Sequence, residues 1–160
     1  MVDRPSRRAG KGPSRTSLAW KLTMATFRTI TATIRFRPEP IKGSRFIATA
    51  TPVASSDEAQ RVIADITSEM PDATHHCWGW SLHDPERSRS SDDGEPGGSA
   101  GRPILAQIQG HKLTNIVVVV TRYFGGTKLG VGGLIRAYGG AAGMVLDRAC
   151  VVEVEETTKL

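Results

Sequence analysis

Three polar segments of this 160-residue sequence carry side chains that can do chemistry, and each of them lies beside an apolar stretch. They are residues 71–77 (PDATHHC), residues 91–98 (SDDGEPGG) and residues 122–133 (RYFGGTKLGVGG). Charged side chains and unpaired backbone groups are costly to bury, so we expect all three segments at the surface. If the strands bring the three segments together, they form one site.

The segment at residues 122–133, called the glycine loop below, has the composition of an anion-binding loop. Glycines placed before a helix leave backbone N–H groups and the positive end of the helix dipole open to a negative ligand. Arg122, Lys128 and Arg136 would add positive charge. The spacing matches neither a Walker A loop nor a dinucleotide fingerprint, and glycine also suits a tight turn or close helix packing. The candidate glycines are Gly125, Gly126, Gly130, Gly132 and Gly133.

The other two segments hold groups from which a metal site or a hydrolase could be built. The candidates are His75, His76, Asp92, Asp93 and Glu95. Adjacent histidines on a strand point to opposite faces, so at most one of the two can join a given site. The usual spacing of metal ligands is absent, and we therefore expect neither a metal nor another cofactor.

These residues also have a purely structural interpretation. Cys77 should share the face of His75, where a small buried thiol is more common than a nucleophile. The acidic residues at 92–95 suit a turn whose side chains cap the backbone. We therefore favour a binding role over catalysis.

Periodic apolar residues predict the elements that position the three segments. Strands and helices do not alternate regularly, which indicates an α+β sandwich. The apolar run at 116–120 indicates a central strand covered on both faces, and the polar stretch at 83–100 is expected to be a long loop. The predicted strands cover residues 29–37, 45–53 (antiparallel to the first), 75–82, 115–123 and 150–154, and the predicted helices cover residues 55–70, 102–111 and 134–148.

The net charge of +5 is confined to the start of the chain. Residues 1–23 hold six of the 21 Lys and Arg residues and one of the 16 Asp and Glu residues, so the remainder is formally neutral. This leader is expected to be disordered, or to precede a true start at Met24. We expect one domain over residues 24–155 and a tail at 156–160. No apolar run is long enough to span a membrane, and two cysteines make no disulfide framework, which favours the cytoplasm.

Four sequence blocks, taken in order, resemble the IMPACT/YigZ family. The resemblance covers approximately residues 41–148 and implies a two-layer α+β sandwich like the second domain of ribosomal protein S5. It adds Arg45 to the candidate site residues, and Tyr123 within the glycine loop is a further candidate. The blocks are Lys42-Gly43-Ser44-Arg45-Phe46, residues 71–77, residues 91–96 with 101–103, and residues 119–138.

Two features depart from the pattern of the family. Bacterial members resemble two-domain proteins with a ferredoxin-like second domain, and we expect that domain to be missing because the sequence stops about ten residues after its last predicted helix. Eukaryotic relatives carry an extra N-terminal domain, and residues 1–40 are too few and too polar to form it.

The resemblance links the chain to the regulation of translation, and three hypotheses follow. The first is a non-catalytic module that binds RNA or a ribosome-associated protein, with the basic residues of the glycine loop on phosphate and Tyr123, Phe124 or Trp78 stacked on a base. The alternative is a small nucleotide-dependent or hydrolytic enzyme that uses His76, Asp92 and Asp93. The third is a protein–protein adaptor. A membrane partner is not expected, and the sequence leaves the oligomeric state open.

Overall fold

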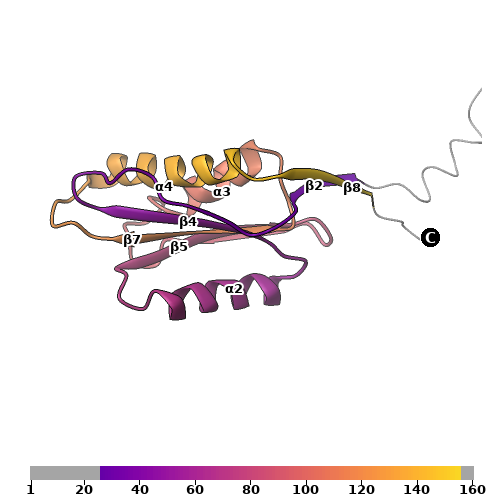
Figure 1. Cartoon of the computed structure of the whole chain (residues 1–160), viewed down its shortest axis with the longest axis horizontal. Helices are drawn as coiled ribbons and strands as arrows, with labels where there is room; N and C mark the ends of the chain where they lie inside the picture. Colours follow the sequence, from indigo (N-terminus) through magenta and orange to yellow (C-terminus); the bar gives the residue numbers. More distant parts are fainter. Residues whose placement is uncertain (1–25, 156–160) are drawn as a thin grey trace, which may run out of the picture. The chain divides into compact units, whose positions relative to one another are not determined.

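Five antiparallel strands form the main sheet of the computed structural model, which describes residues 26–155 (Figure 1). The predicted leader and tail lie outside the described residues. In spatial order the strands are β3 (Ile34–Phe36), β4 (Arg45–Pro52), β7 (Ile116–Tyr123), β5 (His75–Leu82) and β6 (Arg87–Ser91). A separate two-stranded sheet joins β2 (Thr26–Ile30) to β8 (Val151–Glu155).

Helices cover both faces of the five-stranded sheet, as Figure 1 shows. Helices α3 (Gly101–Gly110) and α4 (Gly130–Asp147) pack on one face, and α2 (Ser56–Glu69) packs on the other. The α+β class is therefore confirmed, although helices and sheet make three layers instead of two. The physical reason is β7, which is apolar on both sides and lies in the middle of the sheet, as its sequence predicted.

Local hydrogen bonds fix the start of helix α2. Ser55 caps α2 by accepting a hydrogen bond from the Glu58 backbone N–H at 3.1 Å, and the Glu58 side chain accepts one from the Ala54 N–H at 2.7 Å. The face that carries Ala59, Ile63 and Ile66 is buried against the sheet. Within residues 26–155, no helix has the length and apolar character needed to cross a membrane.

Three predicted elements differ from those observed. The first strand is interrupted at residues 31–33, so that β2 pairs with β8 while β3 pairs with β4. The polar stretch at 83–100 contains β6, an edge strand of Ser and Arg without an apolar face to reveal it. Helix α4 begins at Gly130, four residues before the predicted start, and three of its first four residues are glycines, whose weak helix propensity gives no helical signal in the sequence.

The register of the strands brings distant parts of the sequence to one edge of the sheet, the edge formed by the end of β7 and the starts of β4 and β5. Arg122 near the end of β7 lies opposite Phe46 of β4 on one side and opposite His75 of β5 on the other. Residues 92–100, which connect β6 to α3, leave the sheet beside the start of β5, because Ser91 pairs with Trp78. This edge carries the candidate site.

Candidate functional site

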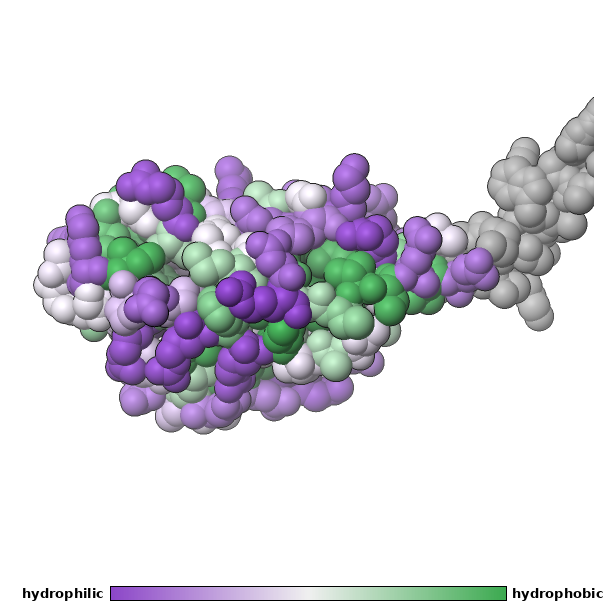
Figure 2. Space-filling view, turned by 45° about the horizontal axis from the view of Figure 1, so that its top comes forward, coloured by the Kyte–Doolittle hydropathy of each residue, from purple (hydrophilic) through white to green (hydrophobic). Residues whose placement is uncertain are grey.

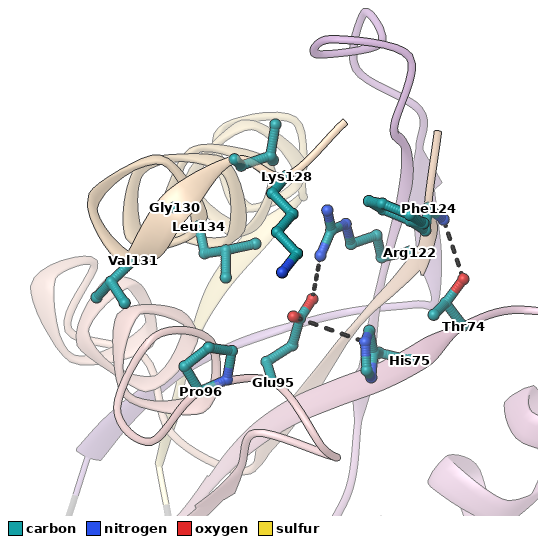
Figure 3. Close-up of a pocket in the computed structure, with 11 residues that line it drawn as sticks. Thr74, His75, Glu95, Pro96, Arg122, Phe124, Lys128, Gly130, Val131 and Leu134 are labelled. Carbon is teal, nitrogen blue, oxygen red and sulfur yellow. Dashed lines mark hydrogen bonds and ion pairs between the residues drawn. The ribbon is translucent and has the colours of Figure 1, made fainter. Parts of the chain in front are cut away.

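A pocket of about 400 Å³ lies at this edge, and all three polar segments contribute to its wall (Figure 3). The edge of the sheet supplies its floor, and the start of α4 supplies its opposite side. The lining residues are Thr74, His75, Glu95, Pro96, Arg122, Phe124, Lys128, Leu129, Gly130, Val131 and Leu134.

A buried ion pair forms the floor of the pocket. Arg122 Nη1 donates to Glu95 Oε2 at 2.7 Å, and the side chains are 5% and 4% exposed. The hydroxyl of Tyr138 donates to the same oxygen. Arg122 Nε and Nη2 donate to Ser44 Oγ at 3.3 Å and 3.2 Å. Buried charges need such partners, so Arg122 is held in place by the protein and its charge is largely balanced.

Two loops meet at Ser44 and fix the start of the glycine loop. Ser44 is fully buried, and its Oγ also accepts a hydrogen bond from the Gly125 N–H at 3.3 Å. A Cβ on Gly125 would lie only 2.0 Å from the carbonyl carbon of Gly43, so only glycine fits there. Ser44 and Tyr138 lie within the blocks that resemble the family, but their role could not be predicted from the sequence because both act through long-range contacts.

The two adjacent histidines point to opposite faces of β5, as strand geometry predicted. His75 lines the pocket: its Nδ1 donates to the carbonyl of Asp93 at 2.7 Å, and its Nε2 lies 3.6 Å from Glu95 Oε1. His76 is buried on the α2 side, where its ring nitrogens bond Thr121 Oγ1 and the Met70 carbonyl, both at 3.0 Å. His76 is therefore separated from the pocket.

The two aspartates organise the connection between β6 and α3. Asp92 accepts hydrogen bonds from the N–H groups of Gly98, Ala100 and Gly101 at 2.8–3.1 Å, and so caps the start of α3. Burial opposes the ionisation of Asp92, but these backbone N–H groups outweigh it and hold the pKa of Asp92 below its ordinary value. Asp93 Oδ2 accepts from the His76 N–H at 2.7 Å. Neither carboxylate lines the pocket.

Cys77 is fully buried, and burial raises the pKa of its thiol to about 12. Its Sγ donates to the Asp92 carbonyl at 3.0 Å. Burial and the neighbouring Cys77 and Glu95 likewise raise the pKa of Tyr138.

The side chains of His76, Asp92 and Asp93, which an enzyme would use, all form hydrogen bonds with backbone groups. Among the described residues, no group of three or more His, Cys, Asp or Glu side chains could hold a metal ion.

The glycine loop and the start of α4 form an exposed wall of the pocket. Lys128 is exposed and points into the pocket in Figure 3, and no carboxylate of the described chain forms an ion pair with it. Gly126 and Gly130 have φ of 92° and 75°, a conformation that favours glycine. Gly132 and Gly133 lie in the first turn of α4, which contains no acidic residue.

Three other candidates lie away from the pocket. Arg45 lies over the ring of Tyr123 at 4.5 Å, and Tyr123 donates to Asp72 Oδ1 at 3.2 Å on the α2 side of the sheet. Arg136 borders two other hollows, which it shares with Ile41. Residue alternation in β7 and the helical repeat in α4 explain the separation.

Apolar side chains are also exposed near the pocket. Phe124 is 46% exposed, and the Arg122 guanidinium lies 5.3 Å from the centre of its ring. Figure 2 shows apolar patches among hydrophilic side chains on one face of the molecule. The large apolar residues with substantial exposure in the described chain are Ile41, Phe124, Val131, Ile135 and Met144.

The fold and the pocket define a class of protein, a small α+β domain with a pocket between its antiparallel sheet and the start of a helix. Polar side chains form the floor of this pocket. A family model described as the Impact N-terminal domain matches residues 42–146. The chain therefore belongs to this family, which confirms the resemblance in its sequence.

Similar proteins support this assignment. The IMPACT family member YigZ of Escherichia coli (strain K12) is 44% identical over 111 residues, which are 68% of this chain and 54% of that protein. The IMPACT family member YvyE of Bacillus subtilis (strain 168) is 43% identical over 114 residues, 71% of this chain and 52% of that protein. The crystal structure of a hypothetical protein has a TM-score of 0.77 and 37% identity, covering 81% of this chain and 64% of the other. The chain spans about half the length of the curated relatives it matches.

Proposed function

We propose that this domain is a non-catalytic binding module that acts in the regulation of translation in the cytoplasm and holds single-stranded RNA at the start of α4. The link to translation comes from the resemblance to the IMPACT/YigZ family. The RNA ligand is argued from the chemistry of the pocket, which offers one place for a phosphate and another for a base.

The observation that carries the proposal is the position of Lys128. Its ammonium group points into the pocket and has no ion-pair partner in the described chain. The charge of Arg122 is already balanced by Glu95. Lys128 therefore leaves the pocket with a net positive charge that suits a phosphate.

The start of α4 supports the same ligand. Gly130 and Val131 line the pocket at the first residues of an 18-residue helix, where backbone N–H groups lack partners within the helix. The helix dipole places partial positive charge at this end, and an acidic side chain is absent from the first turn. Lys128 and the helix start thus favour the same phosphate group.

Phe124 offers a stacking face for a base beside that phosphate. It is 46% exposed on the pocket wall, and its backbone N–H donates to Thr74 Oγ1 at 3.0 Å, which fixes the residue at the edge of the sheet. Stacking of a base on an aromatic ring contributes about 1–3 kcal/mol in single-stranded nucleic-acid binding.

Fluorescence anisotropy with a labelled single-stranded RNA of roughly 12 nucleotides tests the proposal on the full chain. Lys128→Gln should weaken binding several-fold and lower the dependence of log Kd on log salt by about 0.7, the value for one phosphate contact in single strands. Lys112→Gln is the matched control, because Lys112 is exposed beyond the opposite end of β7. Absence of binding at low salt, or equal effects of the two substitutions, would contradict the proposal.

A further inference from the structure

We infer that the floor of this pocket selects a base whose Watson–Crick edge carries an exocyclic amino group beside a ring acceptor, namely cytosine or adenine, over uracil. The inference rests on the proposed function, since it names the base that the same pocket would read. It is carried by the hydrogen-bonding capacity that remains on the buried ion pair.

The first part of this capacity is an acceptor, Glu95 Oε1. The Glu95 side chain is 4% exposed and lines the pocket. Its Oε2 takes the hydrogen bonds from Arg122 and Tyr138. Among residues 26–155 no hydrogen bond reaches Oε1, and the ring nitrogen His75 Nε2 lies 3.6 Å from it. The Oε1 atom therefore keeps its capacity to accept a hydrogen bond, and a ligand N–H in the pocket would use it.

His75 provides a second acceptor beside the first. Its Nδ1 donates to the Asp93 carbonyl, which leaves Nε2 as the ring nitrogen that can accept a hydrogen bond. Figure 3 shows the Glu95 carboxylate between Arg122 and His75. An amino group has two hydrogens, one for Glu95 Oε1 and one for His75 Nε2.

The second part of the capacity is a donor, Arg122. A guanidinium has five N–H groups, and three of them are used in the bonds to Glu95 and Ser44. The others are free to donate to a ring nitrogen next to the amino group of the ligand. Cytosine and adenine present this pattern, whereas uracil places a carbonyl oxygen where cytosine has its amino group. That oxygen would face the Glu95 carboxylate.

Anisotropy titrations of the full chain with oligocytidine and oligouridine of equal length test the inference. We expect oligocytidine to bind about tenfold more tightly, which corresponds to one well-matched base contact. Any contribution from the basic residues at 1–23 should act on the phosphates and be common to both strands.

Glu95→Gln gives the sharper comparison. Its amide oxygen must still accept from Arg122 and Tyr138, so the amide NH₂ replaces Oε1 and turns the acceptor into a donor. The preference for cytidine should then disappear or reverse. Glu86→Gln, the same change at an exposed site on the turn between β5 and β6, should keep it. If Glu95→Gln does not fold, oligonucleotides of N4,N4-dimethylcytidine replace the variant, and wild-type protein should lose its preference for them.

Each outcome of these titrations supports or overturns a specific claim. Equal binding of cytidine and uridine strands by the wild type would overturn this inference while the proposed function stands. A cytidine preference that survives both Glu95→Gln and dimethylation would overturn the role of Glu95. Failure to bind either strand would overturn the proposed function, and the inference with it.

Discussion

Arg122 Nη1 and Glu95 Oε2 lie 2.7 Å apart, and both side chains are almost fully buried. The two residues come from separate polar segments of the sequence, and the strand register brings them together. Ser44 and Tyr138 complete the network from a third and a fourth part of the chain. The pair therefore joins the sheet edge, the connection after β6 and helix α4 at a single point.

Removing one member of this pair should destabilise the fold. Arg122→Met leaves the Glu95 carboxylate buried without its cation, and we expect the free energy of unfolding to fall by about 3–5 kcal/mol. Urea denaturation measures the change. Arg61→Met, at an exposed position of α2, should change it by less than about 0.5 kcal/mol. A similar small change for Arg122→Met would show that the pair is unimportant for stability.

The close approach of Gly43 and Gly125 predicts a strong effect from a single methyl group. A Cβ on Gly125 would overlap the backbone of Gly43, so Gly125→Ala should lower stability by about 2 kcal/mol or more. Gly97→Ala is the control, because a Cβ there meets nothing within 4 Å. Thermal unfolding of both variants checks the prediction, which fails if the two behave alike.

Most helices and strands of this fold could be predicted from the sequence because they bury one regular face. Alternation placed His75 and His76 on opposite faces, and the double-sided apolar run at 116–120 identified the central strand. Strand β6 was not predicted from the sequence because an edge strand of Ser and Arg has no buried apolar face. The start of α4 was not predicted because three of its first four residues are glycines, whose weak helix propensity gives no helical signal in the sequence.

Asp92 should make the fold sensitive to acid. Its native pKa lies below the ordinary value of 3.8, so the ionised carboxylate stabilises the fold above that pH, and this stabilisation is lost as the pH falls through the native pKa. The unfolding free energy of the wild type should therefore drop more steeply below about pH 5 than that of Asp92→Asn. Asp57→Asn, at an exposed position in the first turn of α2, should retain the wild-type slope. Parallel slopes for the wild type and Asp92→Asn would contradict the role of these hydrogen bonds.

The two cysteines should react very differently. Cys77 is buried with a pKa of about 12, whereas Cys150 is exposed. A thiol-specific disulfide reagent at neutral pH should modify Cys150 quickly in the folded chain and Cys77 only after denaturation, because the thiolate is the reactive form. Rapid modification of Cys77 in the folded Cys150→Ser variant would revive the interpretation of Cys77 as a nucleophile.

The site was less predictable than the fold because it depends on contacts between distant residues. Residue type alone suggested that Arg122 would hold a phosphate, but its partner Glu95 balances that charge. The same long-range contacts tie Asp92 and Asp93 to backbone N–H groups. Lys128 keeps its charge available because no carboxylate of residues 26–155 forms an ion pair with it.

The most direct test of the account is to map RNA contacts on the folded chain by the backbone amide signals in NMR. Titration with single-stranded RNA should shift the amides of residues 124–132 most strongly, and Lys128→Gln should reduce these shifts. Residues around Lys112 and on the outer face of α2 should remain unchanged. Shifts confined to α2, or to the segment before residue 26, would contradict an RNA site at the start of α4.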